Sequence, residues 1–294
     1  MKNHYILVTG ATGSLGGMVV RKLLVRGEKV RCLVRKNSRI LDFRDKVDIV
    51  VGSLEDKTSL KRACENVKAI IHCAGVTHTN DASLYYRANY RGTENLMKAA
   101  PADIQKFVYI SSTCAVGEEV GPYGYSKTLA EEALGQSSLP YVIIRTSAVY
   151  GAPMAGMIEK LVTIVQKYPL IPLVGKGDFL MAPVHADDVV GAIVESLYVD
   201  KKRVRYTLAG PEILSYKKIL KKIQSLKAPQ KNITVLPVPL FVYRIAAHIL
   251  GAVQKNPPLY KDQIPRFVTQ KNFDIQKARE DLNFEPRGLE EGLK

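Results

Sequence analysis

The chain has 294 residues, 46% of them hydrophobic and 24% charged, which is typical of a globular protein with a substantial core. No stretch approaches the ~20 apolar residues of a membrane-spanning helix, and the first residues show no signal-peptide pattern. The net charge is +15, but basic and aromatic residues are not interleaved as in nucleic-acid modules. The four cysteines form no CxxC pair, so we expect a cytoplasmic protein without a metal. From the charge pattern we expect no nucleic-acid partner.

The first 150 residues alternate short apolar runs with longer amphipathic segments. The runs suit strands that are buried on both faces. They span Tyr5–Thr9, Lys29–Val34, Val47–Val51, Ala69–Cys73, Phe107–Ser111 and Tyr141–Arg145. Helical patterns between them include Leu15–Arg26, Leu84–Ala100 and Ser126–Leu134. This alternation predicts an α/β fold with a doubly wound, parallel, Rossmann-type sheet.

The pattern changes after Gly151, where proline-bearing stretches break up helices and short strands. We therefore expect a main domain over residues 1–150 and a smaller α+β substrate lobe over residues 151–294. Within the second part, residues 183–200 are expected to pack back on the main domain.

A glycine-rich turn, TGATGSLG, follows the first strand and opens the first helix. Closely spaced glycines there let the backbone approach a pyrophosphate, which then lies at the helix N-terminus. The spacing is G-x-x-G-x-x-G, but the strand–turn–helix context is the required one. It predicts that residues 1–150 bind a dinucleotide through Gly10, Thr12, Gly13, Ser14, Leu15 and Gly16.

The residues after the second strand bear on the choice of cofactor. An acidic residue there would hold the ribose 2′-hydroxyl of NAD, but Arg35 and Lys36 come first and no acid precedes Asp42. Because Arg can bind a phosphate bidentately, this favours NADP, with NAD as the alternative. Four further residues are placed where the cofactor could pass after the third and fourth strands: Ser53, Leu54, Ala74 and Gly75.

A Y-x-x-x-K pattern at Tyr123 and Lys127 opens a predicted helix. The i,i+4 spacing places both side chains on one face, and a nearby ammonium favours the phenolate form of a tyrosine. The preceding strand ends in the hydroxyls of residues 111–113, which can donate to a substrate oxygen. The pattern predicts Tyr123 and Lys127 as an acid–base pair.

These motifs together resemble the extended branch of the short-chain dehydrogenase/reductases, the NAD-dependent epimerase/dehydratase family. Further matches are residues 71–75 (IHCAG), 89–95 (NYRGTEN), 107–112 (FVYISS), 145–151 (RTSAVYG), 183–189 (PVHADDV) and 283–287 (NFEPR). The resemblance implies that Ser112, Tyr123 and Lys127 are catalytic, and that Lys127 also holds the nicotinamide ribose. It places Asn89 near the site in a supporting role. We expect turn or capping roles for His72, His185, Asp187 and Asp188.

Several positions depart from the nucleotide-sugar members of this family. Met181 and Ala182 stand where an Arg-Asp pair is usual, and Thr113-Cys114 where dehydratases have Asp-Glu. Lys176 and Arg266 are other cations that a diphosphate could use. The departures favour an NADP-dependent oxidoreductase acting on a carbonyl or secondary alcohol of a fairly apolar small molecule. A nucleotide-sugar epimerase with bound NAD stays open, as does a non-catalytic NADP(H)-binding module like the relatives of the complex I accessory subunit.

Two neighbouring segments bear on membrane contact. Residues 201–231 hold ten Lys or Arg and one acid, a net charge of +9, and residues 239–253 are strongly apolar. An apolar helix beside cations is typical of binding to anionic lipid. A solvated basic face beside a core helix that lines an apolar pocket is the alternative. The sequence does not decide between them, and a homodimer stays open as well.

Overall fold

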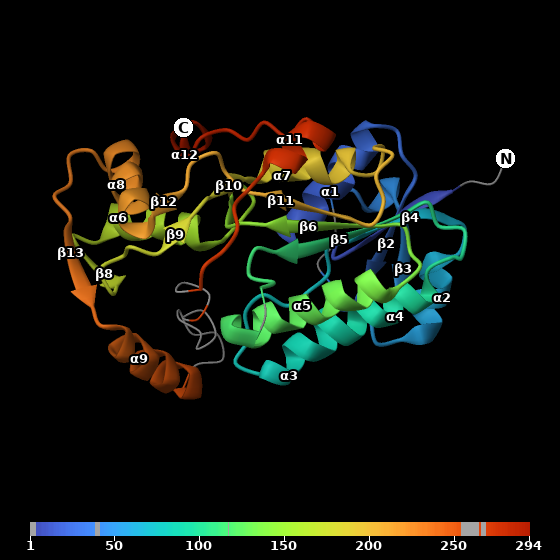
Figure 1. Cartoon of the computed structure of the whole chain (residues 1–294), viewed down its shortest axis with the longest axis horizontal. Coiled ribbons are helices and arrows are strands. Elements are labelled where there is room, and N and C mark those ends of the chain that lie inside the picture. Colours follow the sequence, from blue (N-terminus) through green and yellow to red (C-terminus); the bar gives the residue numbers. More distant parts are fainter. Residues whose placement is uncertain (1–3, 39–41, 117, 254–264, 266–268) are drawn as a thin grey trace.

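Seven parallel strands form the central sheet, in the order β11-β6-β5-β4-β1-β2-β3 (Figure 1). The computed structural model describes residues 4–294 except 39–41, 117, 254–264 and 266–268. The strands are β1 (Tyr5–Thr9), β2 (Val30–Val34), β3 (Asp48–Val51), β4 (Val67–His72), β5 (Lys106–Ser112), β6 (Tyr141–Thr146) and β11 (Val204–Leu208). The predicted doubly wound parallel sheet is confirmed, and the first six strands end within one or two residues of the expected positions.

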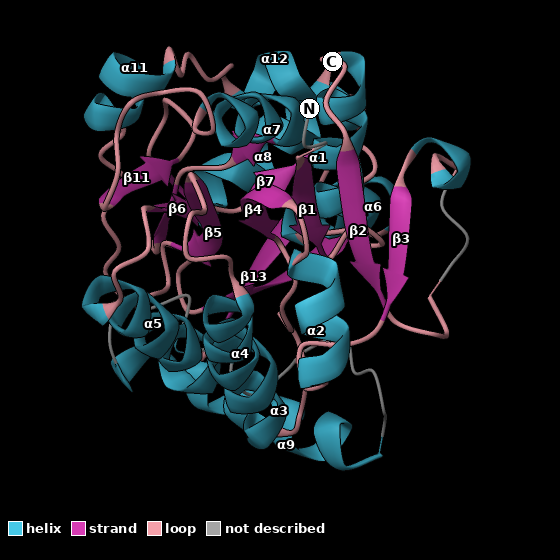
Figure 2. Cartoon of the chain, turned by 90° about the vertical axis from the view of Figure 1, so that its right-hand side faces the viewer, coloured by secondary structure: helices cyan, strands magenta, loops and turns pink. Residues whose placement is uncertain are grey.

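Helices cover both faces of this sheet (Figure 2). One face carries α1 (Ser14–Val25), α7 (Ala186–Glu195) and α11 (Gln276–Leu282), and the other carries α2 (Lys57–Cys64), α4 (Gly92–Ala99) and α5 (Gly121–Gln136). Successive residues of a strand face opposite sides, so Ile6 and Val8 enter the first core and Leu7 the second. Burial on both faces explains why the strands are continuous apolar runs.

The predicted helix Leu84–Ala100 is divided into three parts. It consists of α3 (Ala82–Tyr85), a π-helical turn (Tyr86–Arg91) and α4. The Thr93 hydroxyl donates to the Asn89 carbonyl at 2.6 Å, competing with the regular backbone bond. Helix α5 begins at Gly121, five residues before the predicted start at Ser126, because Pro122 is well suited to a first helical turn.

A second core lies in the lobe at the left of Figure 1. The lobe consists of helices α6 (Met157–Lys167), α8 (Tyr216–Lys227), α9 (Leu240–Val253) and α12 (Leu289–Leu293) and three strand pairs, and its core includes α6, α8 and α12. The pairs are β7 (Val149–Tyr150) with β10 (Val184–His185), β9 (Leu180–Met181) with β12 (Leu214–Ser215), and β8 (Leu170–Val174) with β13 (Thr234–Val238).

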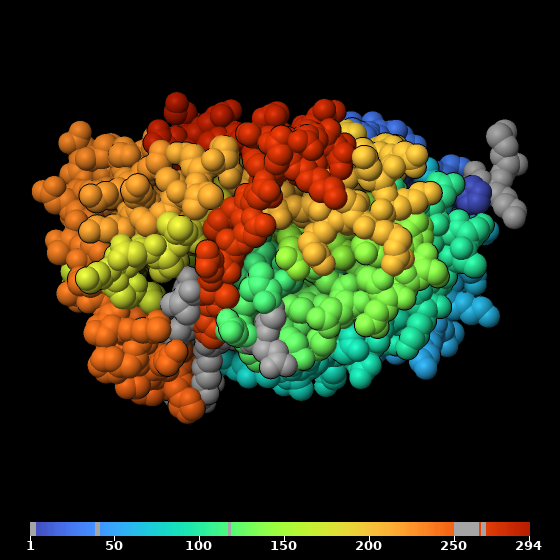
Figure 3. Space-filling model, in the orientation of Figure 1, coloured from blue at the N-terminus to red at the C-terminus, as the bar shows by residue number. Residues whose placement is uncertain are grey.

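Residues 151–294 thus supply this lobe and also β11, α7 and α11 of the main domain. The segment that leads into α11, red in Figure 3, crosses the surface between the orange lobe and the green main domain.

Candidate active site

The glycine-rich turn after β1 is closely packed against the end of β4. Gly10 has a φ of +73°, and a Cβ on it would lie 2.7 Å from the Ala74 nitrogen. A Cβ on Gly16 would collide with the Gly10 carbonyl oxygen. The Ala74 N–H donates to the Thr9 hydroxyl at 3.3 Å. Both glycines are therefore required for the close approach of backbones that a pyrophosphate site needs.

Helix α1 begins at this turn with its N-terminal amides available. Its N-cap is Gly13, which has no side chain to accept a hydrogen bond, and no acid lies in its first turn. Gly13 and Ser14 are exposed, and Thr12 and Leu15 are half-buried. Unsatisfied N–H groups at a helix N-terminus attract phosphate. The turn therefore fits the diphosphate of a dinucleotide.

Arg35 and Lys36 are exposed directly after β2. The first acid beyond them, Asp42, accepts hydrogen bonds from both Arg21 Nε and Nη2 at 2.8–3.1 Å. Asp42 is thereby held by Arg21, and the cations after β2 are placed where the adenosine ribose is expected.

Ser53 and Leu54 follow β3 at the same edge of the sheet. The Ser53 amide donates to the Ser59 hydroxyl at 3.2 Å, and the Leu54 carbonyl accepts from the Asn95 side chain at 2.9 Å. These bonds fix the turn between β3 and α2. The structure thus gathers the residues predicted for the cofactor at the carboxyl ends of β1 to β4, where open α/β sheets bind ligands.

Tyr123 lies in the first turn of α5, with its side chain packed among apolar and aromatic neighbours. Its ring meets that of Tyr85 edge-on at 5.8 Å, and Val76, Cys114 and Val120 complete the cluster. A Cβ on Gly124 would collide with the Cys114 carbonyl oxygen, so α5 packs directly on the turn after β5. This contact brings the turn that carries Ser112 against the turn of α5 that carries Tyr123.

Ser112 ends β5 and is buried. Its hydroxyl oxygen accepts a hydrogen bond from the Cys114 amide at 3.1 Å. An oxygen that accepts in this way keeps its proton for donation, which is the role that a polarising hydroxyl has toward a carbonyl.

Lys127 is buried one turn after Tyr123. Its ammonium donates to the Ile110 carbonyl at 2.9 Å and lies 4.7 Å from the centre of the Tyr109 ring. Burial lowers the pKa of Lys127 to about 8, opposed by the negative charge of Glu131. A Cβ on Gly75 would lie 3.4 Å from the Lys127 Nζ. The structure thus brings Lys127 to the end of β4, where the cofactor is expected to pass.

Glu131 is a part of this region that the sequence analysis missed. Its buried carboxylate accepts from Ser111 at 2.5 Å and pairs with Arg145 at 2.8 Å and Arg205 at 2.9 Å. It therefore fixes α5 to β5, β6 and β11. The signal was present in the sequence, because Tyr123, Lys127 and Glu131 repeat at a spacing of four and share one face of the helix.

Asn89 ties the same region together from the π-helical turn. Its side-chain oxygen accepts from the Val76 backbone N–H at 2.7 Å. Its side-chain nitrogen donates to the Val76 carbonyl at 2.9 Å and to the Ser126 hydroxyl at 3.1 Å. Ser126 in turn donates to the Tyr123 carbonyl at 2.7 Å. Asn89 thus fixes the start of α5 relative to the end of β4, a positioning role.

The other polar residues singled out from the sequence have structural contacts. His72 is buried, with hydrogen bonds to Thr9 and Thr93, and burial lowers its pKa to about 3, so it is neutral. His185 caps α7 by accepting from the Asp187 amide at 3.3 Å. Asp188 holds Arg287 bidentately. In the part of the chain that the structure describes, no group of three or more His, Cys, Asp or Glu could hold a metal.

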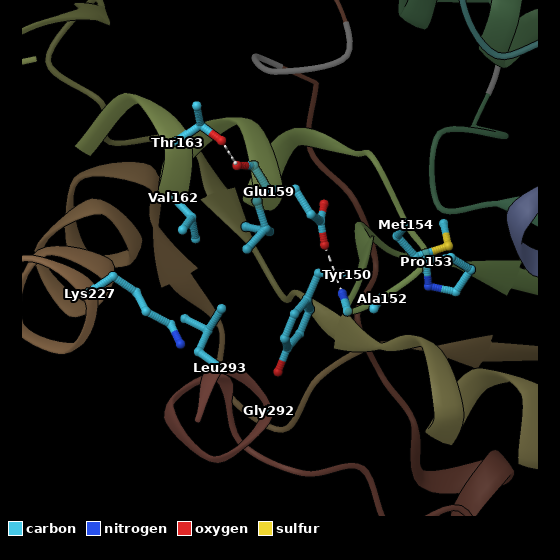
Figure 4. A pocket seen from close by; sticks show the side chains of 12 residues that line it. Tyr150, Ala152, Pro153, Met154, Glu159, Val162, Thr163, Lys227, Gly292 and Leu293 are labelled. Atoms are coloured by element: carbon cyan, nitrogen blue, oxygen red, sulfur yellow. Dashed lines mark hydrogen bonds between the residues drawn. The ribbon is translucent and has the colours of Figure 1, made fainter. Parts of the chain in front are cut away.

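A hollow of about 430 Å³ lies in the lobe, between α6 and α12 (Figure 4). Figure 4 shows Glu159 on its wall, with Lys227 reaching in from α8. The Glu159 carboxylate accepts a hydrogen bond from the Gly151 amide at 2.7 Å. Of the predicted site residues, none lines it within the described parts of the chain. Pro153, which lines the hollow, also contacts the cofactor turn, because its carbonyl accepts from the Ser14 hydroxyl at 3.2 Å.

Comparisons with known proteins show the family to which the chain belongs. The model of the NAD dependent epimerase/dehydratase family matches residues 6–207. The UDP-glucose 4-epimerase of Vibrio cholerae is 27% identical over 98% of this chain and 93% of its own length. A putative dihydroflavonol 4-reductase of Synechocystis is 28% identical, over 99% and 94%.

The fold is shared with the UDP-glucose 4-epimerase of Thermotoga maritima, crystallised with UDP-glucose. That structure has a TM-score of 0.78 and 22% identity, over 99% of this chain and 96% of the other. The family resemblance of the motifs is therefore confirmed: the chain belongs to the NAD dependent epimerase/dehydratase family.

Proposed function

We propose that this chain is an NADP-dependent oxidoreductase that interconverts a carbonyl and a secondary alcohol on a fairly apolar small molecule. The observation that carries the proposal is the placement of Tyr123, Lys127 and Ser112 around the carboxyl ends of β4 and β5. The surroundings of Tyr123 are apolar and aromatic, formed by Tyr85, Val76 and Val120. An apolar substrate needs such a wall, whereas a charged one would lose solvation there.

Each residue has a distinct part in the reduction direction. NADPH, held by the turn after β1 and by Lys127, would supply the hydride that the carbonyl carbon accepts. Ser112 donates a hydrogen bond to the carbonyl oxygen while negative charge develops on it. Tyr123 gives its proton to that oxygen, which completes the alcohol and leaves a phenolate. The Lys127 ammonium stabilises the phenolate, and a proton from solvent restores Tyr123.

The choice of NADP rests on Arg35 and Lys36. Both are exposed after β2, and Asp42 is held by Arg21 and so does not compete for them. A guanidinium can hold a 2′-phosphate with two hydrogen bonds. Neither Arg35 nor Lys36 could accept a hydrogen bond from a 2′-hydroxyl, as an acidic residue would. The described parts of this loop hold no other acid before Asp45.

A nucleotide-sugar epimerase is the second candidate, favoured by the relatives that bear that name. The residues for a diphosphate count against it. Met181, half-buried in β9, and Ala182, fully buried, have apolar side chains. Neither position therefore offers a cation. Lys176 is exposed in the preceding loop, and Arg266 lies outside the described residues. Enclosing a diphosphate without a cation is costly.

The test is a titration of the NADP-loaded protein with UDP, GDP and TDP sugars, followed by activity assays of apolar ketones with NADPH and of apolar alcohols with NADP. We expect turnover with a member of the second group, and no nucleotide-sugar binding tighter than roughly millimolar, about −4 kcal/mol. Micromolar binding of a nucleotide sugar would put the epimerase first. Tight NADPH binding without turnover of any compound would favour the non-catalytic module.

A further inference from the structure

Helix α9 turns its larger apolar side chains outward. Phe241, Ile245 and Ile249 repeat at a spacing of four and are 63%, 55% and 58% exposed. The side that faces the protein carries Tyr243, which is half-buried, and Ala247, which is fully buried. Surface helices ordinarily keep their large apolar residues toward the core, so three large exposed ones on one side of α9 indicate a contact surface.

The strand pair that leads into α9 also carries exposed leucines. In β8 and β13, Leu170 and Leu236 are 52% and 49% exposed, while Ile171 and Leu173 are buried. The register pairs Leu236 with Pro172 and Thr234 with Leu170, so both exposed leucines lie on one face of the pair. Figure 1 shows β13 leading directly into α9. We call Leu170, Leu236, Phe241, Ile245 and Ile249 the apolar face.

The charge around this face is of one sign. Residues 170–174 and 234–253, which form β8, β13 and α9, contain one Arg and one His and no Asp or Glu. Arg244 and His248 are exposed on the same side of α9 as Ile245, and Lys167 is exposed three residues before the start of β8. A soluble partner with ordinary mixed charges would gain little here, whereas a surface of anionic headgroups complements both features.

We propose that the apolar face is a docking surface for a membrane that contains anionic lipid. Phe241, Ile245 and Ile249 insert at the level of the headgroups, and Arg244 and Lys167 contact phosphates. Helix α9 has 14 residues, and none of the described helices is long and apolar enough to cross a bilayer. The contact is therefore interfacial, with α9 lying along the membrane.

The basic segment 201–231 has a smaller part in this proposal than its charge suggests. Arg205 pairs with Glu131, Lys222 pairs with Glu212 and Glu290, and Arg203 donates to backbone carbonyls. Helix α8 also lies at the other end of the lobe from α9 in Figure 1. The cations that serve the apolar face are thus those of α9 and of the residues before β8.

The experiment is vesicle flotation with phosphatidylcholine alone and with phosphatidylcholine that also contains phosphatidylglycerol. We expect the wild type to float with the anionic vesicles, and the Phe241→Ser/Ile245→Ser variant to bind roughly tenfold more weakly or worse. The matched control is Val25→Ser/Val51→Ser, which removes two exposed valines, 84% and 50%, from the main domain. The control should float like the wild type.

A charge variant keeps the test decisive if the double variant unfolds. Arg244→Glu leaves the apolar side chains in place and should weaken binding to anionic vesicles more at low salt than at high salt. The proposal is overturned if the wild type binds neither vesicle, or if the variants bind as well as the wild type. A dimer that dissociates in the Phe241→Ser/Ile245→Ser variant, with no vesicle binding, would assign the face to a second copy of the chain.

Discussion

The ammonium of Lys127 lies against Gly75, although 52 positions separate them in the chain. A Cβ on Gly75 would lie 3.4 Å from the Lys127 Nζ and 2.9 Å from the Asn89 Oδ1. Lys127 is fixed by its bond to the Ile110 carbonyl, and Asn89 by its bonds to Val76. Neither neighbour can therefore move away without losing a hydrogen bond. The missing side chain of Gly75 leaves room for the ammonium at the end of β4.

The first prediction is that Gly75→Ala weakens nicotinamide cofactor binding roughly tenfold, since overpacking a fixed site typically costs ~1–3 kcal/mol. Isothermal titration with NADPH measures it. Gly135→Ala is the control, because a Cβ at that position in α5 meets nothing within 4 Å. Unchanged affinity in Gly75→Ala would separate Gly75 from the cofactor site.

Much of the fold was predictable because its strands are buried on both faces. A run such as the one at Tyr141 has few alternatives to a central parallel strand, and the glycine turn fixes where the first helix begins. Strand β11 was not predicted. Its residues Arg205 and Thr207 interrupt the apolar run, since β11 is an edge strand whose Arg205 reaches Glu131.

The candidate site was predictable residue by residue but not as a network. Local spacing placed Tyr123 and Lys127 on one helix face. No local pattern could show that Glu131 binds arginines from β6 and β11, or that Asn89 reaches Val76 and Ser126, because these contacts depend on how distant segments pack. Nor could an apolar pattern in residues 239–253 show which side of α9 faces outward.

The second prediction concerns the cofactor. Arg35→Ala should reduce the preference for NADPH over NADH, because one charged contact to a phosphate contributes ~1.5–3 kcal/mol. Dissociation constants of both cofactors for both proteins measure the change. Lys202→Ala, which removes an exposed cation at the opposite edge of the sheet, should leave the preference unchanged. Equal dissociation constants in the wild type would contradict the NADP assignment.

The third prediction concerns the chemistry. Tyr123→Phe should lower turnover ~10²–10⁴-fold on a true substrate, because the proton donor is lost, while NADPH affinity changes little. Tyr125→Phe serves as the control: this tyrosine is two residues further on and packs edge-on against Tyr86 at 6.2 Å. Steady-state kinetics and NADPH titration of the same preparations separate the two effects. Full turnover in Tyr123→Phe would remove Tyr123 from the mechanism.

The last prediction is that the buried ammonium of Lys127 lowers the free energy of unfolding at neutral pH. Burial lowers its folded pKa to about 8, against ~10.4 in an unfolded chain. Between these values the unfolded chain binds more protons, so this group's contribution to the free energy of unfolding rises with pH. Below pH 8 the folded protein bears the full cost of a buried ammonium. Lys127→Met should therefore raise the free energy of unfolding at pH 7 by up to about 3 kcal/mol, and this gain should shrink as the pH rises toward ~10.4.

Urea unfolding of the cofactor-free proteins at several pH values measures the gap in the free energy of unfolding between Lys127→Met and the wild type. Lys98→Met, at an exposed position, is the control. A gap that stays constant with pH, or a less stable variant at pH 7, would show that Lys127 is not a buried, destabilising charge.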